Sequence, residues 1–238
     1  MKDKQSTEKA KRRAALEAVK HVTDDSIIGL GSGSTTAYAV EEIGRRIKRE
    51  KINILVVPTS HQTLTLAVKH QIPITTLTEH PSLDLTIDGA DQIDNELNLI
   101  KGMGGALTRE KIVASASRRL IIIADNTKKV EILGENNQPV PVEVLPFAAP
   151  VLTSKIIEIG GRPRTRESRE KVGPVITDNC NWIIDANFGL INKPAELEHK
   201  IKSLPGVVET GLFIRMTEQA YIGYESNVLR LSAPITGN

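Results

Sequence analysis

The sequence predicts an α/β protein in two parts, an open and mainly parallel sheet followed by a smaller α+β module. Residues 119–125, R-L-I-I-I-A-D, are a continuous apolar run, which is typical of a parallel strand buried on both faces. Residues 26–48 have the pattern of strand, glycine-rich turn and helix, the unit that builds such sheets. From about residue 141 the expected order is strand, helix, strand, strand, helix, strand, the order of a ferredoxin-like module.

Composition narrows the class of function. The 31 Lys and Arg nearly balance the 29 Asp and Glu, and aromatic residues are only 3%, so we expect no nucleic-acid partner. No apolar run approaches a membrane span, and the N-terminus lacks the apolar core of a signal peptide, so we expect no membrane association. The single cysteine, Cys180, excludes an internal disulfide and suits a reducing compartment. We therefore expect a cytoplasmic protein.

The first elements lead to a glycine-rich turn. Residues 6–22 predict a helix with Ala15, Leu16, Val19 and Val22 on its apolar face. Residues 26–30 predict a strand, followed by G-S-G-S-T-T at 31–36 and a helix over 37–48. Unpaired N–H groups at a helix N-terminus, together with the helix dipole, favour an anion. The alternative is a serine-capped helix that binds no ligand.

The turn at 31–36 lacks the sequence motifs of nucleotide-binding loops, and this indicates the type of anion. It has neither the Gly-Lys-Ser/Thr ending of a Walker loop nor the third glycine of G-x-G-x-x-G, where Ser34 stands. The next predicted strand, 52–57, runs into P-T-S without an acidic residue for a nucleotide ribose. A dinucleotide is disfavoured, and one phosphate on a small molecule fits better.

The stretch from 83 to 117 concentrates the residues suited to acid–base chemistry. A strand over 83–87 brings Asp88 and Asp91 to a glycine-containing turn. A strand over 97–100 leads to Lys101 and three glycines, which let backbone N–H groups approach a ligand. We expect Thr108 to be a helix N-cap, with a staple between Leu107 and Ile112, and Glu110 in the first turn. Taken singly, each residue fits a structural role; the combination indicates a catalytic site.

A metal site is not expected in this stretch. Asp88, Asp91 and Asp94 are three residues apart, whereas a calcium loop needs ligands two apart and a downstream Glu.

The remaining elements complete the predicted fold. We expect a helix over 61–70 with His61 and His70 structural, an outlying strand over 72–77, and Lys128 just past the strand 119–125. The second module has predicted strands at 141–147, 162–169, 181–186 and from 207, and predicted helices at 150–159 and 195–204. The segment 211–224 predicts strands that return to the first domain. The predicted domains are 1–131 with 210–238, and 132–209.

Two further features of the second module are interpreted as structural. D-N-C-N-W at 178–182 predicts a hairpin turn without a nearby histidine, which disfavours catalysis by its cysteine. A basic cluster, interrupted by glutamates, is interpreted as a solvated or subunit-contact hairpin. It consists of Arg162, Arg164, Arg166, Arg169 and Lys171.

With these motifs in place, the chain resembles the type A ribose-5-phosphate isomerases along most of its length. The matching motifs are G-S-G-S-T-T at 31–36, D-G-A-D at 88–91, K-G-M-G-G-A-L-T-R-E-K at 101–111, I-A-D at 123–125, P-V-E-V-L-P at 141–146 and G-L-F at 211–213. The resemblance implies a Rossmann-like domain that carries the site and a smaller ferredoxin-like domain. It also implies interconversion of ribose 5-phosphate and ribulose 5-phosphate, a step of the non-oxidative pentose phosphate pathway, without metal or cofactor, by a homodimer or homotetramer.

The resemblance also assigns site residues. Glu110 matches the catalytic base, and Lys128 a substrate contact. Three binding loops match Ser32, Gly33, Ser34 and Thr35; Asp88, Gly89, Ala90 and Asp91; and Lys101, Gly102, Met103 and Gly104. Met103 departs from the glycine common at its position, and Ser32 stands where threonine also occurs.

The chemistry of these residues fits an aldose–ketose isomerisation. One carboxylate, Glu110, can take a proton from one carbon and return it to its neighbour. Lys101 and loop N–H groups can stabilise the enediolate oxygen. Either Asp88 or Asp91 is the candidate for opening the sugar ring, and the sequence does not decide between them.

Two other functions are weighed against this one. A non-catalytic sugar-phosphate sensor would need the phosphate loop but neither Glu110 nor Lys101, and both are present. An amino-sugar phosphate isomerase/deaminase or a CoA transferase shares the sheet topology but not the run at 101–111.

Overall fold

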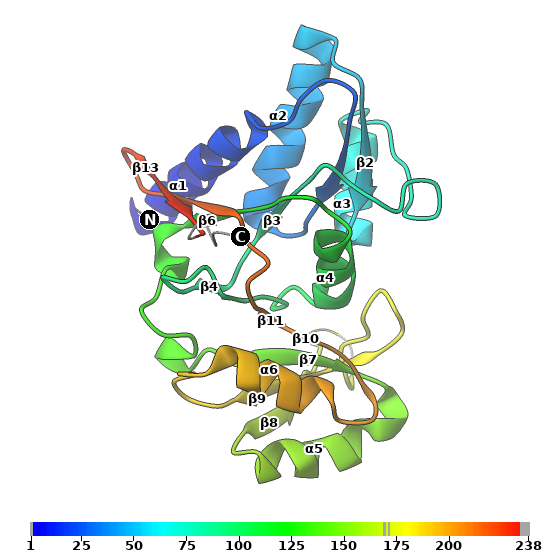
Figure 1. Cartoon of the computed structure of the whole chain (residues 1–238), viewed down its shortest axis with the longest axis vertical. Coiled ribbons are helices and arrows are strands. Elements are labelled where there is room, and N and C mark those ends of the chain that lie inside the picture. The colour runs from blue at the N-terminus through cyan, green and yellow to red at the C-terminus, as the bar shows by residue number, and fades with distance from the viewer. Residues whose placement is uncertain (1, 169, 171, 234–238) are drawn as a thin grey trace, which may run out of the picture. The chain divides into compact units, whose positions relative to one another are not determined.

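The computed structural model describes residues 2–168, 170 and 172–233 (Figure 1). Arg169 and Lys171 of the predicted basic cluster, and residues 1 and 234–238 of the predicted first domain, lie outside the described residues. The α-helices are α1 (Lys2–Val19), α2 (Ser34–Glu50), α3 (His61–Lys69), α4 (Leu107–Ser115), α5 (Ala149–Glu158) and α6 (Pro194–Lys202). The strands are β1 (Ser26–Leu30), β2 (Ile54–Pro58), β3 (Leu85–Gly89), β4 (Gln92–Ile93), β5 (Leu99–Ile100), β6 (Leu120–Asp125), β7 (Val140–Val144), β8 (Arg162–Thr165), β9 (Trp182–Asn187), β10 (Val207–Thr210), β11 (Leu212–Phe213), β12 (Gln219–Gly223) and β13 (Val228–Ser232). Short 3₁₀ turns are η1 (Asn126–Lys128), η2 (Glu135–Asn137) and η3 (Pro146–Ala148).

The chain divides into two compact units. The first unit comprises the described residues of Met1–Ala90, Arg109–Lys129 and Arg215–Asn238, and the second comprises those of Asp91–Thr108 and Val130–Ile214. The chain therefore passes between the units four times. The predicted domain boundaries, 1–131 with 210–238 and 132–209, concern which parts of the chain fold independently, and they stay a prediction.

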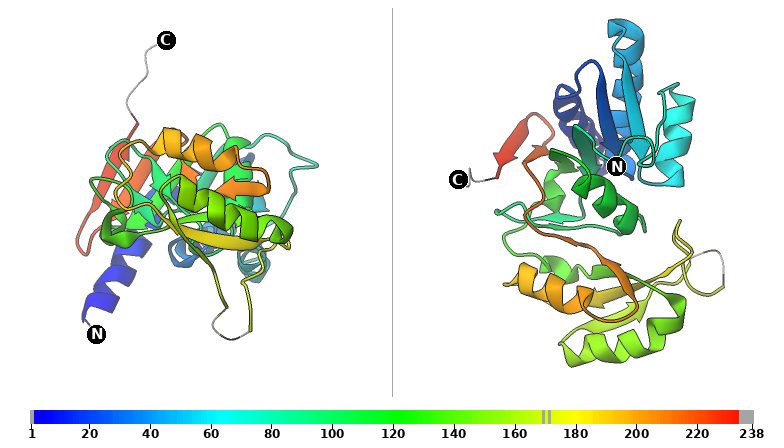
Figure 2. Two further views of the ribbon diagram at one scale, coloured as in Figure 1. Left: turned by 90° about the horizontal axis from the view of Figure 1, so that it is seen from below. Right: turned by 45° about the vertical axis from the view of Figure 1, so that its right-hand side comes forward.

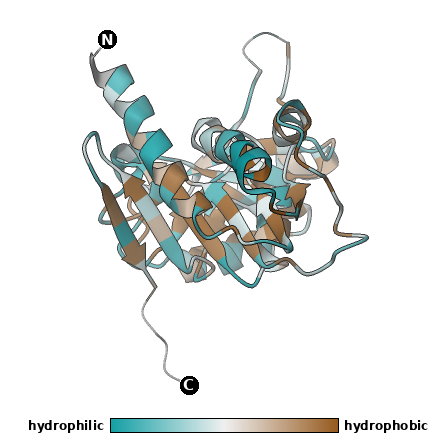
Figure 3. Cartoon of the chain, turned by 90° about the horizontal axis from the view of Figure 1, so that it is seen from above, coloured by the Kyte–Doolittle hydropathy of each residue, from teal (hydrophilic) through white to brown (hydrophobic). Residues whose placement is uncertain are grey.

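The first unit is built on a six-stranded sheet in the order β13-β12-β6-β3-β1-β2. All its neighbours are parallel except β12 and β13, which form an antiparallel pair at one edge (Figure 2). All six residues of β6 are buried, as its apolar run predicts. Hydrophobic residues gather on the strands in Figure 3, and the turns of α1 nearest the N-terminus are hydrophilic. The predicted open parallel sheet is therefore confirmed.

Helices cover both faces of this sheet because successive strand residues point to opposite sides. Ile28 and Leu30 of β1 belong to a core that also contains residues of α1, α2 and α3. Ile27, which precedes them on the strand, packs instead in a smaller cluster with Val113 of α4. Burial of apolar side chains on both faces stabilises the parallel strands.

The second unit contains the predicted ferredoxin-like module. Its elements follow the order β7, α5, β8, β9, α6, β10, and the four strands form an antiparallel sheet in the order β10-β7-β9-β8. Its core includes Val142 and Ile184 from the strands and Leu152 and Ile201 from the helices. A three-stranded sheet, β11-β5-β4, belongs to the same unit.

Two local predictions were wrong. The predicted strand 72–77 is reduced to one isolated bridge between Ile74 and Val56. The N-terminal helix ends at Val19 rather than at residue 22, although Val22 is still buried in the core. The segment 211–224 forms strands that pair with elements of residues 1–131, as predicted: β12 pairs with β6, and β11 pairs with β5. Short apolar runs specify burial more firmly than they specify a strand partner.

Candidate active site

The first unit brings the turn at 31–36 beside Asp88. Strands β1 and β3 are parallel neighbours, and the Gly31 N–H donates to Ile87 O at 3.0 Å. Asp88 is fully buried, and its Oδ1 accepts from the Gly89 N–H at 2.7 Å. A Cβ at Gly31 would lie only 1.8 Å from Asp88 Oδ1. Glycine at 31 is therefore required for the Asp88 carboxylate to lie against the turn.

The N-terminus of α2 lacks a side-chain cap. Gly33 is the N-cap with φ 108°, and no side-chain hydrogen bond caps it within the described part of the chain. The first intrahelical hydrogen bond runs from Ala37 N to Gly33 O at 3.1 Å, so the N–H groups of Ser34 and Thr35 precede it. The serine-capped alternative is therefore not the one that forms. A helix start of this kind favours an anion through its N–H groups and dipole.

Ser32 is held by a cluster of hydroxyl groups that the sequence analysis missed. Its Oγ lies 2.6 Å from Ser60 Oγ, 3.0 Å from Thr59 Oγ1 and 3.3 Å from Thr63 Oγ1. Thr63 Oγ1 also donates to Gly31 O at 2.7 Å, and Ser60 is the N-cap of α3. The hydroxyl cluster therefore fixes the turn before α2 to the start of α3. The P-T-S sequence after β2 was the available signal.

Glu110 lies in the first turn of α4, as predicted, and is only 4% exposed. Glu110 is therefore not a residue of the exposed helix surface. The helix begins at Leu107 in the second unit and continues in the first from Arg109. A carboxylate near the positive end of a helix dipole is stabilised in its charged form.

The predicted cap of α4 was wrong. The helix begins one residue before Thr108, whose hydroxyl donates to Glu143 Oε2 at 2.6 Å instead of capping. The predicted staple is also absent, because Leu107 is buried while Ile112 is 48% exposed.

Glu143, on β7, is the centre of a buried hydrogen-bond network in the second unit. It is fully buried and accepts from four side chains. Oε2 accepts from Thr108, while Oε1 accepts from Thr177 Oγ1 at 2.9 Å, Asn179 Nδ2 at 3.0 Å and Asn181 Nδ2 at 2.9 Å. This network connects the first turn of α4 to the turn that precedes β9, and it gives the P-V-E-V motif a structural role.

The second unit contains Asp91 and the loop from Lys101 to Gly104. Asp91 Oδ2 accepts from the Met103 N–H at 2.9 Å, which places this predicted aspartate against the predicted loop. Lys101 is 3% exposed, and its Nζ lies 5.3 Å from the centre of the Phe213 ring. Gly102 and Gly105 have φ angles of 102° and 82°. Glycine adopts such positive φ angles without steric cost. The positive φ angles of this loop therefore fall on glycines, and Met103 does not have to adopt the left-handed conformation.

Lys128 and Ala90 complete the predicted set. Lys128 ends the 3₁₀ turn η1, directly after β6, and is half-buried. Ala90 follows β3, which is the parallel neighbour of β6. Side chains and loops at the carboxyl ends of neighbouring parallel strands form the usual ligand edge of an open α/β sheet. In the first unit, such ends are occupied or followed by the turn at 31–36, by Asp88 to Ala90 and by Lys128.

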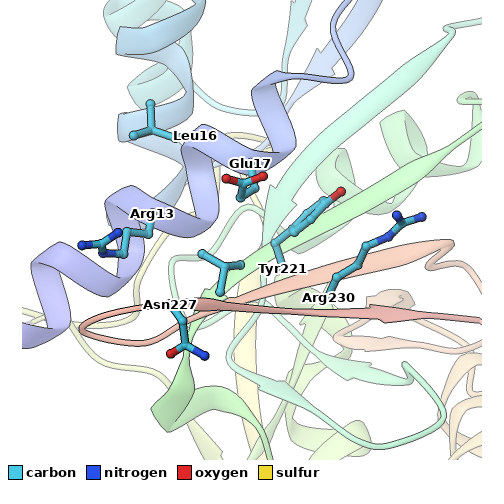
Figure 4. Close-up of a pocket in the computed structure, with 7 residues that line it drawn as sticks. Arg13, Leu16, Glu17, Tyr221, Asn227 and Arg230 are labelled. Atoms are coloured by element: carbon cyan, nitrogen blue, oxygen red, sulfur yellow. The ribbon is translucent and has the colours of Figure 1, made fainter.

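A surface pocket of about 500 Å³ lies elsewhere in the first unit, between α1 and the β12–β13 hairpin (Figure 4). Arg13 and Glu17 line it from the helix, and Tyr221 and Arg230 from the strands. None of its lining residues is among the predicted site residues.

In the part of the chain that the structure describes, no group of three or more His, Cys, Asp or Glu side chains is placed to hold a metal ion. Within the same residues, no helix is both long and apolar enough to cross a membrane.

Comparison with known proteins gives a consistent result. The family model for "Ribose 5-phosphate isomerase A (phosphoriboisomerase A)" matches residues 55–227. The ribose-5-phosphate isomerase A of Methanosarcina acetivorans is 48% identical over 221 residues, covering 93% of each protein. The solved structure of ribose 5-phosphate isomerase A from Methanocaldococcus jannaschii matches with a TM-score of 0.91 and 42% identity, over 94% of this chain and 99% of the other. A structure of D-ribose-5-phosphate isomerase in complex with phospho-erythronic acid matches with a TM-score of 0.92 and 41% identity, over 95% and 99% of the two chains.

Proposed function

Since the chain belongs to the ribose 5-phosphate isomerase A family, we propose that it interconverts D-ribose 5-phosphate and D-ribulose 5-phosphate. The observation that carries the proposal is the buried carboxylate of Glu110 in the first turn of α4, within the intact run 101–111. A base that removes a proton from carbon must be held at a fixed place and shielded from water. A buried carboxylate on a rigid helix meets both requirements.

Glu110 acts as the base in this proposal. It removes the proton from C2 of the open-chain aldose and returns it to C1, while the proton of the C2 hydroxyl passes to the C1 oxygen, which leaves the carbonyl at C2. The enediolate between these steps carries charge on oxygen. Lys101 and the N–H groups of Gly102 and Gly104 are the donors assigned to that charge, because donors fixed in advance stabilise it most effectively.

The phosphate is assigned to the N-terminus of α2. Gly33 is the N-cap and has no side-chain cap among the described residues, and Ser34 and Thr35 supply N–H and hydroxyl donors. Lys128, at the end of the 3₁₀ turn η1 that follows β6, is assigned to the substrate as a cation. The relative's complex with phospho-erythronic acid supports a site for both a phosphate and a carboxylate group.

Ring opening needs a group that takes and gives a proton at the ring oxygen and the C1 hydroxyl. Asp88 and Asp91 both stay candidates. Asp88 is fully buried against Gly31, and Asp91 is half-buried beside the Met103 amide. A homodimer or homotetramer and a cytoplasmic location also stay predictions, and light scattering of the purified chain measures the first of these.

The experiment is an assay of ketopentose formation from ribose 5-phosphate by the purified chain. One sample is treated with EDTA and dialysed, and a second is left untreated. We expect equal turnover in both. No turnover in either sample contradicts the isomerase proposal, and loss of turnover only after EDTA contradicts a reaction without metal. A sugar-phosphate sensor would bind ribose 5-phosphate without converting it, so a binding measurement on the same preparation separates these functions.

A further inference from the structure

Arg166 belongs to the cluster that was predicted to be a solvated or subunit-contact hairpin, yet its side chain is half-buried and fully engaged. Its side chain is only 13% exposed, and its Nε donates to Asp185 Oδ2 at 2.8 Å. Its Nη2 donates to the other carboxylate oxygen of Asp185. The Arg166 backbone is also fixed, because its N–H donates to Ile183 O and its carbonyl accepts from Val175 N, both at 2.8 Å. Arg162 and Arg164, by contrast, are exposed.

The third nitrogen of Arg166 contacts the predicted substrate loop. Nη1 donates to Gly102 O at 3.0 Å and to Met103 O at 3.0 Å. Nη2 also lies 3.9 Å from Met103 Sδ. Asp185 accepts hydrogen bonds from the other two nitrogens of the Arg166 guanidinium, Nε and Nη2, so the plane of the guanidinium is fixed. One half-buried ion pair therefore determines where two consecutive loop carbonyls point.

Fixed carbonyls also fix the N–H groups on the far side of each peptide. A trans peptide is planar, so its N–H points opposite to its C=O. The Gly102 carbonyl on Arg166 directs the Met103 N–H away, where Asp91 Oδ2 accepts it at 2.9 Å. The Met103 carbonyl on Arg166 directs the Gly104 N–H away in the same manner. Gly104 is exposed, and a Cβ built there meets nothing within 4 Å, so a ligand has room to approach.

We propose that Arg166, oriented by Asp185, is a positioning residue that aims the Gly104 N–H at the charged oxygen of the bound sugar. This inference rests on the proposed isomerase function and adds to it a residue outside the loop and outside the assigned site. Arg166 itself does not touch the substrate in this proposal. It acts through the two peptide planes that it holds.

The test is Arg166→Lys, compared with Arg164→Lys as the matched control. Lysine keeps the charge beside Asp185 but is a point donor, so it cannot hold the carboxylate and both carbonyls together. Loss of one oxyanion donor lowers kcat by about 10²–10³-fold, and a donor that is misdirected rather than lost should cost about 10–100-fold. We expect kcat of R166K to fall by about 10–100-fold with KM changed about threefold or less, while R164K stays within about twofold of the parent.

Inhibitors provide a readout that a merely structural role would not change. Phospho-erythronic acid has a carboxylate where the reacting oxygen would lie, whereas inorganic phosphate occupies only the phosphate site. R166K should weaken inhibition by phospho-erythronic acid by about the same factor as kcat and leave inhibition by phosphate unchanged. A kcat within twofold of the parent, or equal weakening of both inhibitors, overturns the inference.

A second variant covers the case in which R166K does not fold. R166M/D185N removes both charges, so no buried carboxylate is left without a counter-ion. The variant whose circular dichroism matches the parent is the one assayed, and failure of both to fold would make Arg166 a stability residue and refute the proposal. If the parent itself does not turn over ribose 5-phosphate, the proposed function fails together with this inference. If the parent is active and the folded variant is equally active, only the inference fails.

Discussion

Replacing Glu143 by Gln tests the buried network directly. Glu143 Oε1 accepts three hydrogen bonds, from Thr177, Asn179 and Asn181, and Oε2 accepts one from Thr108. Glutamine keeps the size of the side chain and leaves one oxygen, which can still face the three donors at Oε1. Its amide group would then face the Thr108 hydroxyl, and a donor would replace an acceptor there.

The magnitude follows from these four bonds. Hydrogen bonds to a charged acceptor contribute about 1.5–3 kcal/mol, and those to a neutral acceptor about 0.5–1.5 kcal/mol. The three hydrogen bonds to Oε1 should therefore each weaken by roughly 1 kcal/mol. The fourth, from the Thr108 hydroxyl, is lost or reversed. Glutamine avoids the cost of burying a charge, which offsets part of the loss. We expect the free energy of unfolding to fall by about 2–3 kcal/mol, and Tm by roughly 4–12 °C for a chain of this size.

Urea unfolding followed by tryptophan fluorescence measures this change in the free energy of unfolding, with a probe close to the network. The single tryptophan, Trp182, lies on β9 opposite Val144 of β7, the strand that carries Glu143. Glu158→Gln is the matched control, because Glu158 is 59% exposed, pairs with Lys155 on α5, and should cost about 1 kcal/mol or less. If E143Q is no less stable than E158Q, the reasoning about the network is refuted.

Three other substitutions test separate parts of the molecule. Glu110→Gln keeps size but removes the base, so kcat should fall by roughly 10²–10⁴-fold with little change in phosphate inhibition; a kcat within a few-fold of the parent would remove Glu110 from the mechanism. Thr35→Ala should raise KM by about 10–100-fold, the equivalent of one charge-assisted hydrogen bond, and lower kcat less; the reverse pattern would place the phosphate elsewhere. His21 has its pKa lowered from 6.5 by burial and by Arg119, so the unfolded state binds its proton more readily and the folded chain loses stability as the pH falls below about 6.5. His21→Gln should therefore reduce the loss of stability between about pH 7 and pH 5, and an unchanged slope in chemical denaturation would contradict this.

Local patterns in the sequence determined most of the fold and the outline of the site. The run at 119–125 and the order of elements after residue 141 predicted the buried strand β6 and the antiparallel module. The turn at 31–36 and the start of α4 were placed within a few residues, with Glu110 in the first helical turn as expected. These features depend on hydrophobic periodicity and glycine conformation, which act between residues close in sequence.

Contacts between distant segments decided the rest. Thr108 has the sequence context of a cap, but a hydroxyl binds the strongest acceptor in reach, and the fold brings Glu143 to it from 35 residues away. Arg166 lies in a charged run that resembles a solvated hairpin, yet strand pairing places Asp185 beside it and tertiary packing brings the carbonyls of Gly102 and Met103 within 3.0 Å. A charged side chain is buried only where partners from other elements satisfy it, and the tertiary structure alone determines which partners are near.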